Sequence, residues 1–198
     1  MTGKPLLAGL DAGNLVDRLE ALFAVVVAHS YLGEDVTIGD HMLQCAALAA
    51  AEGADEPLIA AALLHDIGYY LDPAPDSDNE AVPARRHDVA AGRALAALLP
   101  EATVAPIRLH VEAKRYLCAT EPSYYDVLSE ASRHTMRLQG GVLSAGEAAA
   151  FAALPHAMAA CRVRRWDDAG KTVGARVPGF AHWRPMLERL VVAGPGAG

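Results

Sequence analysis

Apolar residues recur every three or four positions along most of the chain, which is the spacing of one buried face of an α-helix. Alternation of apolar and polar residues, the pattern of a half-buried strand, is rare, and the strong helix former alanine is abundant. The sequence therefore predicts an all-α protein. The expected helices cover residues 15–28, 37–53, 55–68, 83–99, 103–118, 148–154, 155–167 and 183–191.

Capping residues mark several of these helix starts. Thr37 and Ser144 each open a pattern that resembles a capping box, and Asp55 precedes a proline that suits a first helical turn. Residues 72–83 combine Pro, Asp, Ser and Asn without an apolar period, which predicts a long exposed loop. Residues 192–198 are expected to form a frayed tail.

The chain is expected to form a single domain. Its 198 residues suffice for one buried core, and they include no internal repeat, linker or low-complexity block. We therefore expect one helical bundle over residues 1–198, with its core between about residues 15 and 191.

Composition and charge exclude several classes of protein. Hydrophobic residues make up 53% of the chain and charged residues 21%, which argues against disorder. The longest apolar run, residues 21–28, is far shorter than the ~20 residues of a membrane span. The net charge of -7 opposes binding to nucleic acid or anionic lipid. The three cysteines stand far apart and support neither a disulfide framework nor a thiolate zinc site. We expect a cytoplasmic protein, a monomer or small homo-oligomer, that binds neither nucleic acid nor membrane.

Four of the eight histidines recur at intervals of roughly 23 residues, each in or at the end of an expected helix. Helices of a bundle can direct such side chains to a shared point, as in two-metal sites built from histidine and carboxylate. Two aspartates would add oxygen ligands, and this donor set suits iron, manganese or similar metals. Isolated helix histidines are also common as ordinary core or surface residues, so spacing alone leaves both interpretations open. The residues concerned are His41, His65, His87, His110, Asp66 and Asp167.

Residues 63–68, with the sequence Leu-Leu-His-Asp-Ile-Gly, and the histidines before and after them resemble the HD-domain superfamily of metal-dependent phosphohydrolases. A closer resemblance lies in residues 31–37, 41–44, 60–66, 110–118, 138–141 and 164–168. These runs are similar to the PhnZ/TmpB-like HD-domain mixed-valence diiron oxygenases, which cleave the carbon–phosphorus bond of 1-hydroxy-2-aminoethylphosphonates. The match spans about residues 31–171 and keeps the order and nearly the spacing of its parts.

The resemblance implies two irons that share one bridging carboxylate, Asp66. A bridging carboxylate couples two metals at short distance, and neutral imidazoles leave both Fe(II) and Fe(III) accessible. The further ligands would be His41, His65 and Asp167 on the first iron and His87 and His110 on the second.

The resemblance also implies residues that act on the substrate. Tyr31 would ligate the second iron at rest and, with Glu34, move away when the substrate arrives. A phosphonate dianion requires a fixed point charge, a forked donor and short hydroxyl donors. The residues that match phosphonate-binding positions are Lys114, Arg164, Ser132 and Thr135.

One position departs from that family. Tyr69 stands where those oxygenases have a histidine that contacts the phosphonate. Either the Tyr69 hydroxyl replaces that contact or the phosphonate end is rearranged. Aromatic faces bind quaternary ammonium groups, so the tyrosines also favour an N-methylated substrate. In the plainer interpretation, Tyr69 and Tyr70 are wall residues beneath the loop of residues 72–83.

We therefore expect an oxygenase that uses two Fe ions, as a mixed-valence Fe(II)/Fe(III) pair, with O2 as cosubstrate. Its substrate would be a small organophosphonate, 1-hydroxy-2-(trimethylammonio or amino)ethylphosphonate, which it would cleave to phosphate and glycine betaine or glycine. The alternative is a metal-dependent HD phosphohydrolase, in which the metals activate water and no displaceable Tyr31 is needed. A regulatory HD module would be expected to lack one or more metal ligands, and this chain keeps the full set.

Overall fold

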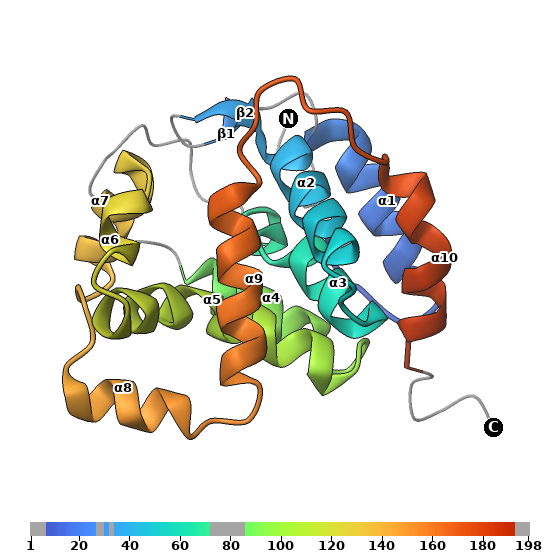
Figure 1. The fold of residues 1–198 in the computed structure, drawn as a ribbon. Coiled ribbons are helices and arrows are strands. Elements are labelled where there is room, and N and C mark those ends of the chain that lie inside the picture. Colours follow the sequence, from blue (N-terminus) through green and yellow to red (C-terminus); the bar gives the residue numbers. More distant parts are fainter. Residues whose placement is uncertain (1–6, 27–29, 32–33, 72–85, 193–198) are drawn as a thin grey trace.

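The computed structural model describes residues 7–26, 30–31, 34–71 and 86–192 (Figure 1). Nearly all the described secondary structure is helical, which confirms the expected all-α fold. The strands β1 (Ser30–Tyr31) and β2 (Glu34–Thr37) pair antiparallel as a short hairpin. The helices are α1 (Leu15–Val26), α2 (Ile38–Ala51), α3 (Glu56–Leu64), the 3-10 helix η1 (Ile67–Tyr70), α4 (His87–Leu95), α5 (Glu101–Thr120), α6 (Tyr124–Val127), α7 (Glu130–Leu138), α8 (Ala145–Ala152), α9 (Ala157–Ala169) and α10 (Phe180–Leu190).

Two groups of helices are arranged around a packed pair, α5 and α9. On one side α2, α3 and α4 contact this pair, and α1 and α10 cover α2 and α3 from outside. On the other side lie α6, α7 and α8, to the left of α9 in Figure 1. The pair therefore contacts both groups.

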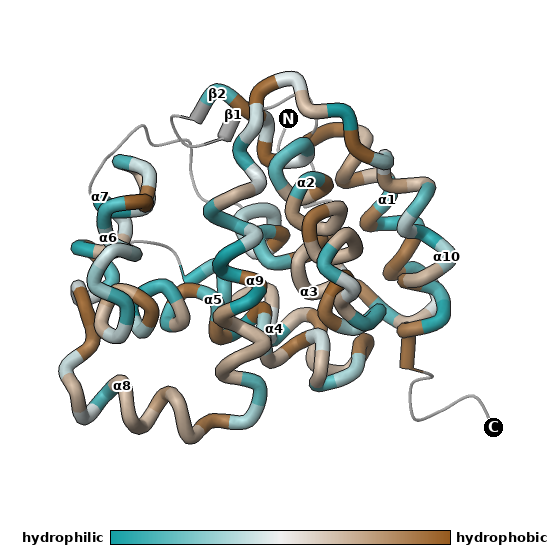
Figure 2. Tube along the Cα trace, in the orientation of Figure 1, coloured by the Kyte–Doolittle hydropathy of each residue, from teal (hydrophilic) through white to brown (hydrophobic). Residues whose placement is uncertain are grey.

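Each side of the pair has its own apolar core. The larger core includes Leu19 of α1 and Leu63 of α3, and the smaller one includes Leu117 of α5 and Phe151 of α8. The helix α3 is apolar on nearly every side (Figure 2). Residues 60–62 are wholly buried alanines, and their small side chains let α3 approach both α2 and α5 closely.

The predicted helix caps are confirmed. The side chains of Thr37 and Asp55 each accept a hydrogen bond from the backbone N–H three residues further on, at 3.0 and 3.3 Å. Ser144 and Glu147 form a complete capping box, in which each side chain accepts from the backbone N–H of the other. These caps place the starts of α2, α3 and α8.

Helix ends differ from the predicted ones by a few residues. The helix α5 begins at Glu101 and α10 at Phe180, two and three residues before the predicted starts. The predicted loop at 72–83, the first residues of the expected helix 83–99 and most of the expected tail lie outside the described residues. None of the described helices is both long enough and apolar enough to cross a membrane.

The sequence pattern does not predict the hairpin or the helices α6 and α7. The reason is clear for α7, because only Ser132 and Met136 of its nine residues are buried. A helix with so few buried apolar residues gives only a short apolar stripe in the sequence, although its polar and apolar sides are well separated. Its start is nonetheless capped, since the Ser129 hydroxyl accepts from the backbone N–H of Ser132 at 3.2 Å.

Candidate metal centre and adjoining cavity

The six predicted metal ligands lie together, deep in the fold. Each is at most 5% exposed, although they come from segments far apart in the sequence. One lies on α2, one at the end of α3, one just before η1, one at the start of α4, one on α5 and one near the end of α9. In that order they are His41, His65, Asp66, His87, His110 and Asp167.

Asp66 lies between two pairs of imidazoles. Its Oδ2 is 3.8 Å from the Nε2 of His41 and 3.5 Å from that of His65. Its Oδ1 is 3.3 Å from the Nε2 of His87 and 3.9 Å from that of His110. Each carboxylate oxygen therefore faces one pair, which is the arrangement of a bridging ligand between two metals.

Asp167 joins only the first of these pairs. Its Oδ1 is 3.4 Å from the Nε2 of His41, and its Oδ2 is 3.9 Å from the Nε2 of His65. We call His41, His65 and Asp167 the closed half of the centre, and His87 and His110 the open half, with Asp66 common to both. Both histidines of the open half line the cavity described below, whereas Asp167 is the one member of the closed half among the described residues that do so.

Backbone contacts fix which ring nitrogen faces the centre. The Nδ1 atoms of His41, His65 and His110 lie 3.0, 2.9 and 2.7 Å from the carbonyl oxygens of Gly170, Ala62 and Ile107. Because a carbonyl oxygen only accepts, each Nδ1 carries the proton, and a neutral ring then points the lone pair of its Nε2 inward.

These inward nitrogens lie too close together to remain without a cation. The Nε2 atoms of His41 and His65 are 3.2 Å apart, and those of His87 and His110 are 3.0 Å apart. Facing lone pairs at that distance repel unless a proton or a metal ion lies between them, and the two compete for such sites. Four imidazole nitrogens and two carboxylates form a donor set that fits iron.

The ionisation of Asp66 and of His110 also suits metal binding. Burial alone would raise the pKa of the Asp66 carboxyl, but the imidazoles of His65 and His87 outweigh it and hold that pKa below its usual range. Burial lowers the pKa of His110 to about 3, and the neighbouring His87 adds to the effect. Asp66 is thus an anion and His110 a neutral ring, which are the forms that ligate metals.

Two glycines allow the segments that carry ligands to approach each other. A Cβ on Gly68 would lie 1.9 Å from the carbonyl oxygen of His87, so η1 and α4 can pack closely only without one. A Cβ on Gly170 would lie 2.6 Å from the Sγ of Cys45. Gly68 therefore brings Asp66 near His87, and Gly170 holds the carbonyl that orients His41.

Cys45 lies beside the closed half, a neighbour that the sequence pattern did not reveal. Its Sγ is 3.8 Å from both ring nitrogens of His41 and 3.3 Å from the carbonyl oxygen of Trp166. Burial raises the pKa of this thiol. The thiol therefore keeps its proton and donates to the carbonyl.

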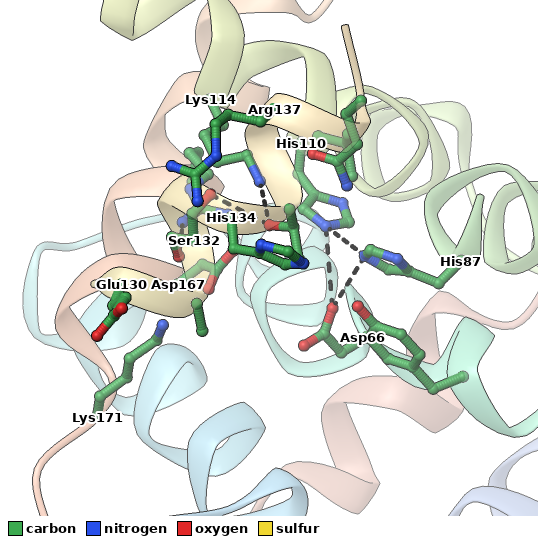
Figure 3. A pocket seen from close by; sticks show the side chains of 16 residues that line it. Asp66, His87, His110, Lys114, Glu130, Ser132, His134, Arg137, Asp167 and Lys171 are labelled. Carbon is green, nitrogen blue, oxygen red and sulfur yellow. Dashed lines mark hydrogen bonds and ion pairs between the residues drawn. The ribbon is translucent and has the colours of Figure 1, made fainter. Parts of the chain in front are cut away.

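A cavity of about 390 Å³ opens beside the open half (Figure 3). Asp66, His87 and His110 lie at one end of the labelled group in Figure 3, with Glu130 and Lys171 at the other. Among the described residues that line it are all five predicted substrate-binding residues, which are Lys114, Ser132, Thr135, Arg164 and Tyr69.

Lys114 offers a buried positive charge to this cavity. It stands one helical turn after His110, is only 2% exposed and donates from Nζ to the Thr135 hydroxyl at 2.9 Å. Burial lowers the pKa of its ammonium to about 7, and the charge of Arg164 contributes. An anion in the cavity would offset both effects.

Arg164 is a second buried cation at the cavity. Its Nη1 donates to the Asp167 Oδ2 at 2.6 Å, and its Nη2 donates to the Ser132 hydroxyl at 3.1 Å. Burial alone would lower its pKa, but the carboxylates of Asp167 and Asp168 outweigh burial and raise it well above its usual value. Arg164 therefore links the closed half to the wall formed by α7.

Comparison with known proteins identifies the family. The family model of the HD domain matches residues 38–148, which is more than half of the chain. The chain belongs to the HD-domain family. Within this HD domain, His65 and Asp66 form the His-Asp pair on which the sequence resemblance rests.

Curated relatives match this chain over most of its 198 residues. The 1-hydroxy-2-(trimethylamino)ethylphosphonate dioxygenase (glycine-betaine-forming) of Leisingera caerulea is 39% identical over 98% of this chain and 99% of its own. The hydroxymethylphosphonate dioxygenase of Gimesia maris is 38% identical over 87% of each chain. An uncharacterised protein of Acanthamoeba polyphaga mimivirus is 31% identical over 87% of this chain and 80% of its own.

Tyr69 lies at the open half of the candidate metal centre. Its ring stacks on that of His87, with centroids 4.2 Å apart and planes inclined by 16°. Burial raises the pKa of its phenol, and the nearby Asp66 carboxylate adds to the effect. The hydroxyl thus stays protonated and can donate. Tyr31 and Glu34 have backbones in the β1–β2 hairpin, but their side chains lie outside the described residues.

Further polar residues, which the sequence pattern did not single out, line the cavity of the HD domain. Glu130, His134 and Arg137 follow one another at spacings of four and three along α7, and Lys171 lies just beyond α9. The helical spacing of these polar residues is the signal that would have revealed α7 as a cavity wall.

Proposed function

We propose that this protein is an iron-dependent oxygenase that cleaves the carbon–phosphorus bond of a small 1-hydroxyphosphonate. One observation carries the proposal, namely a cavity that joins the open half of the candidate metal centre to a buried lysine and a buried arginine. Two relatives that share most of the chain support it, since both are named as dioxygenases of 1-hydroxyphosphonates.

The metal is proposed to be a pair of irons in the mixed-valence Fe(II)/Fe(III) state. The closed half would hold one iron, the open half the other, and Asp66 would bridge them, consistent with one Asp66 oxygen facing each pair of imidazoles. When bound, such a pair supplies the redox chemistry with O2 that amino-acid side chains lack. Nitrogen and oxygen ligands without a thiolate suit iron in both states.

The cavity residues would hold the substrate by its phosphonate. Lys114 provides a point charge, Ser132 and Thr135 provide hydroxyls, and Arg164 provides a second positive charge that is fixed in place. Because Lys114 stands one turn from His110, a phosphonate held there places the adjacent carbon at the open half. Lys114, Ser132 and Arg164 are buried, which would limit the access of water to this wall of the cavity.

The proposed reaction balances without an external reductant. The substrate loses its C1–H and C–P bonds, one O2 is consumed, and its two oxygen atoms appear in a carboxylate and in inorganic phosphate. The protein would hold the C1–H toward the bound oxidant and fix the phosphonate until the bond is broken.

For the rest of the substrate we propose a 2-trimethylammonio or 2-amino group, so that the product is glycine betaine or glycine. The Leisingera caerulea relative, whose name includes the trimethylamino substrate, covers nearly the whole chain. Glu130 lines the end of the cavity away from the open half and offers a carboxylate to a cation. The smaller hydroxymethylphosphonate is the competing candidate.

A substrate panel tests this function. The protein would be reconstituted with iron without oxygen, and phosphate release would be measured with the trimethylammonio, amino and hydroxymethyl substrates, with and without O2. We expect O2-dependent release, fastest with one of the two amine substrates. Full-rate release without O2 would instead identify a phosphohydrolase, and fastest turnover of hydroxymethylphosphonate would overturn the amine assignment.

A further inference from the structure

Asp168 holds Arg164 by a two-point contact within α9. The Arg164 Nε donates to the Asp168 Oδ2 at 3.1 Å, and the Arg164 Nη2 donates to the Asp168 Oδ1. The two residues are four apart in the sequence, so one turn of helix brings them face to face. A guanidinium that donates two parallel hydrogen bonds to one carboxylate is fixed in its plane as well as in its position.

Asp168 is itself held from a second helix. The Tyr124 hydroxyl, on α6, donates to the Asp168 Oδ2. Tyr124 is 5% exposed, and the Asp168 side chain is 13% exposed. The carboxylate therefore has a fixed orientation that does not depend on α9 alone.

The contacts leave Arg164 directed toward two places. Its Nη1 reaches the candidate ligand Asp167, and its Nη2 reaches Ser132 on the cavity wall, as described above. Asp168 is not among the described residues that line the cavity, whereas Arg164 and Ser132 are. Asp168 thus lies behind Arg164, on the side away from a bound phosphonate.

We infer that Asp168 is a positioning residue for phosphonate recognition, which it serves by fixing the Arg164 guanidinium against the cavity. This inference rests on the proposed function. Without the Asp168 carboxylate, Asp167 is the one anionic partner that the guanidinium keeps among the described residues, and the two-point contact that fixes its plane is lost.

The test compares Asp168→Asn with the wild-type protein, both loaded with iron. Asparagine keeps the shape of the side chain but replaces one acceptor oxygen by a donor. The dissociation constant of methylphosphonate, which lacks the reacting hydroxyl, would be measured beside KM, kcat and iron content. We expect the dissociation constant and KM to rise about tenfold, as for a lost charge-assisted contact, with kcat within about twofold and iron unchanged.

Three further variants separate positioning from general stability. Asp168→Glu restores the carboxylate and should recover part of the affinity, while Tyr124→Phe should weaken it by about threefold. If Asp168→Asn does not fold, Asp168→Glu and Tyr124→Phe still test whether Asp168 positions Arg164 for phosphonate binding. The matched control is Glu121→Gln, which breaks the exposed pair between Glu121 and Arg165, the residue after Arg164, and should change none of the constants.

The outcomes distinguish the inference from the function on which it rests. A wild-type protein that does not bind methylphosphonate would overturn the proposed function. If the wild-type protein binds methylphosphonate and Asp168→Asn has the same dissociation constant, the role of Asp168 alone is overturned. Where Asp168→Asn does not fold, unchanged dissociation constants in both Asp168→Glu and Tyr124→Phe would overturn that role. Loss of iron in Asp168→Asn would also overturn it, and would assign the residue to the metal centre instead.

Discussion

The two halves of the metal centre use the same residue types but have different surroundings. In the closed half, both imidazoles donate from Nδ1 to backbone carbonyls, Cys45 packs against His41, and neither histidine is among the described residues that line the cavity. In the open half, His87 and His110 both line the cavity, and Tyr69 stacks on His87. In the proposed function, the closed half would chiefly anchor the centre, whereas the open half would face the substrate.

The difference also appears in the elements that each half joins. The closed half connects α2, α3 and α9, which belong to separate parts of the sequence and pack against one another. The open half connects η1, α4 and α5, and leaves one side free for the cavity. A change in the closed half should therefore affect metal content and stability, and a change around the open half should affect kinetics.

The largest effect is expected where the two halves meet. Asp66→Ala removes the proposed bridge, so iron content should fall from about two per chain to nearly zero, and O2-dependent phosphate release should disappear. Metal analysis and a phosphate assay measure these. The control is Asp17→Ala, because Asp17 is an exposed carboxylate far along the chain from the candidate ligands and pairs with Arg184 at 2.6 Å. Retention of both irons by Asp66→Ala would contradict the bridging role.

A large effect on kcat/KM, without an effect on iron content, is expected from Lys114→Ala in the cavity beside the open half. The variant loses a charge-assisted contact to a dianion in a buried site, which should cost about 2–4 kcal/mol in kcat/KM, or roughly 30- to 1000-fold. Iron content should not change, since no metal ligand is altered. Arg108→Ala removes a cation from the exposed surface of the same helix and serves as the control. Unchanged kinetics in Lys114→Ala would leave Arg164 as the main phosphonate contact.

The lowered pKa of Lys114 predicts a pH dependence. Since burial brings this pKa to about 7, the ammonium loses its proton as pH rises through that value, and kcat/KM should then fall by up to about tenfold per pH unit. A bound dianion favours the charged lysine, so kcat should fall at a higher pH than kcat/KM does. In Lys114→Arg the cation persists, and this fall should vanish. An identical profile in that variant would assign the fall to another group.

The sequence singled out the residues of the candidate metal centre more completely than those of the cavity. The six candidate ligands lie in or beside strongly patterned helices, and the His65-Asp66 motif belongs to a recognisable family, so both kinds of information gave the same set. The caps at Thr37, Asp55 and Ser144 were equally readable, because a cap depends on neighbouring residues only.

The cavity wall was harder to predict because its helix, α7, is polar on the side that lines the cavity. Apolar periodicity finds helices that pack on a core, and α7 buries little apart from Ser132 and Met136. Contacts such as those of Cys45 with His41, or of Tyr124 with Asp168, join residues whose proximity depends on tertiary packing. Pattern alone does not specify packing of that kind.

The smallest predicted effect separates the two interpretations of Tyr69. Tyr69→Phe keeps the stack on His87 and removes only the hydroxyl, so a donor to the phosphonate would be lost at a cost of about 1 kcal/mol, or roughly a fivefold rise in KM. On the closed side, Cys45→Ala removes a comparable contact and should lower Tm without changing KM, since Cys45 is not among the described cavity residues. Steady-state kinetics and thermal unfolding of both variants measure the contrast. An unchanged KM in Tyr69→Phe would make Tyr69 a wall residue that supports His87, with the phosphonate held by Lys114 and Arg164.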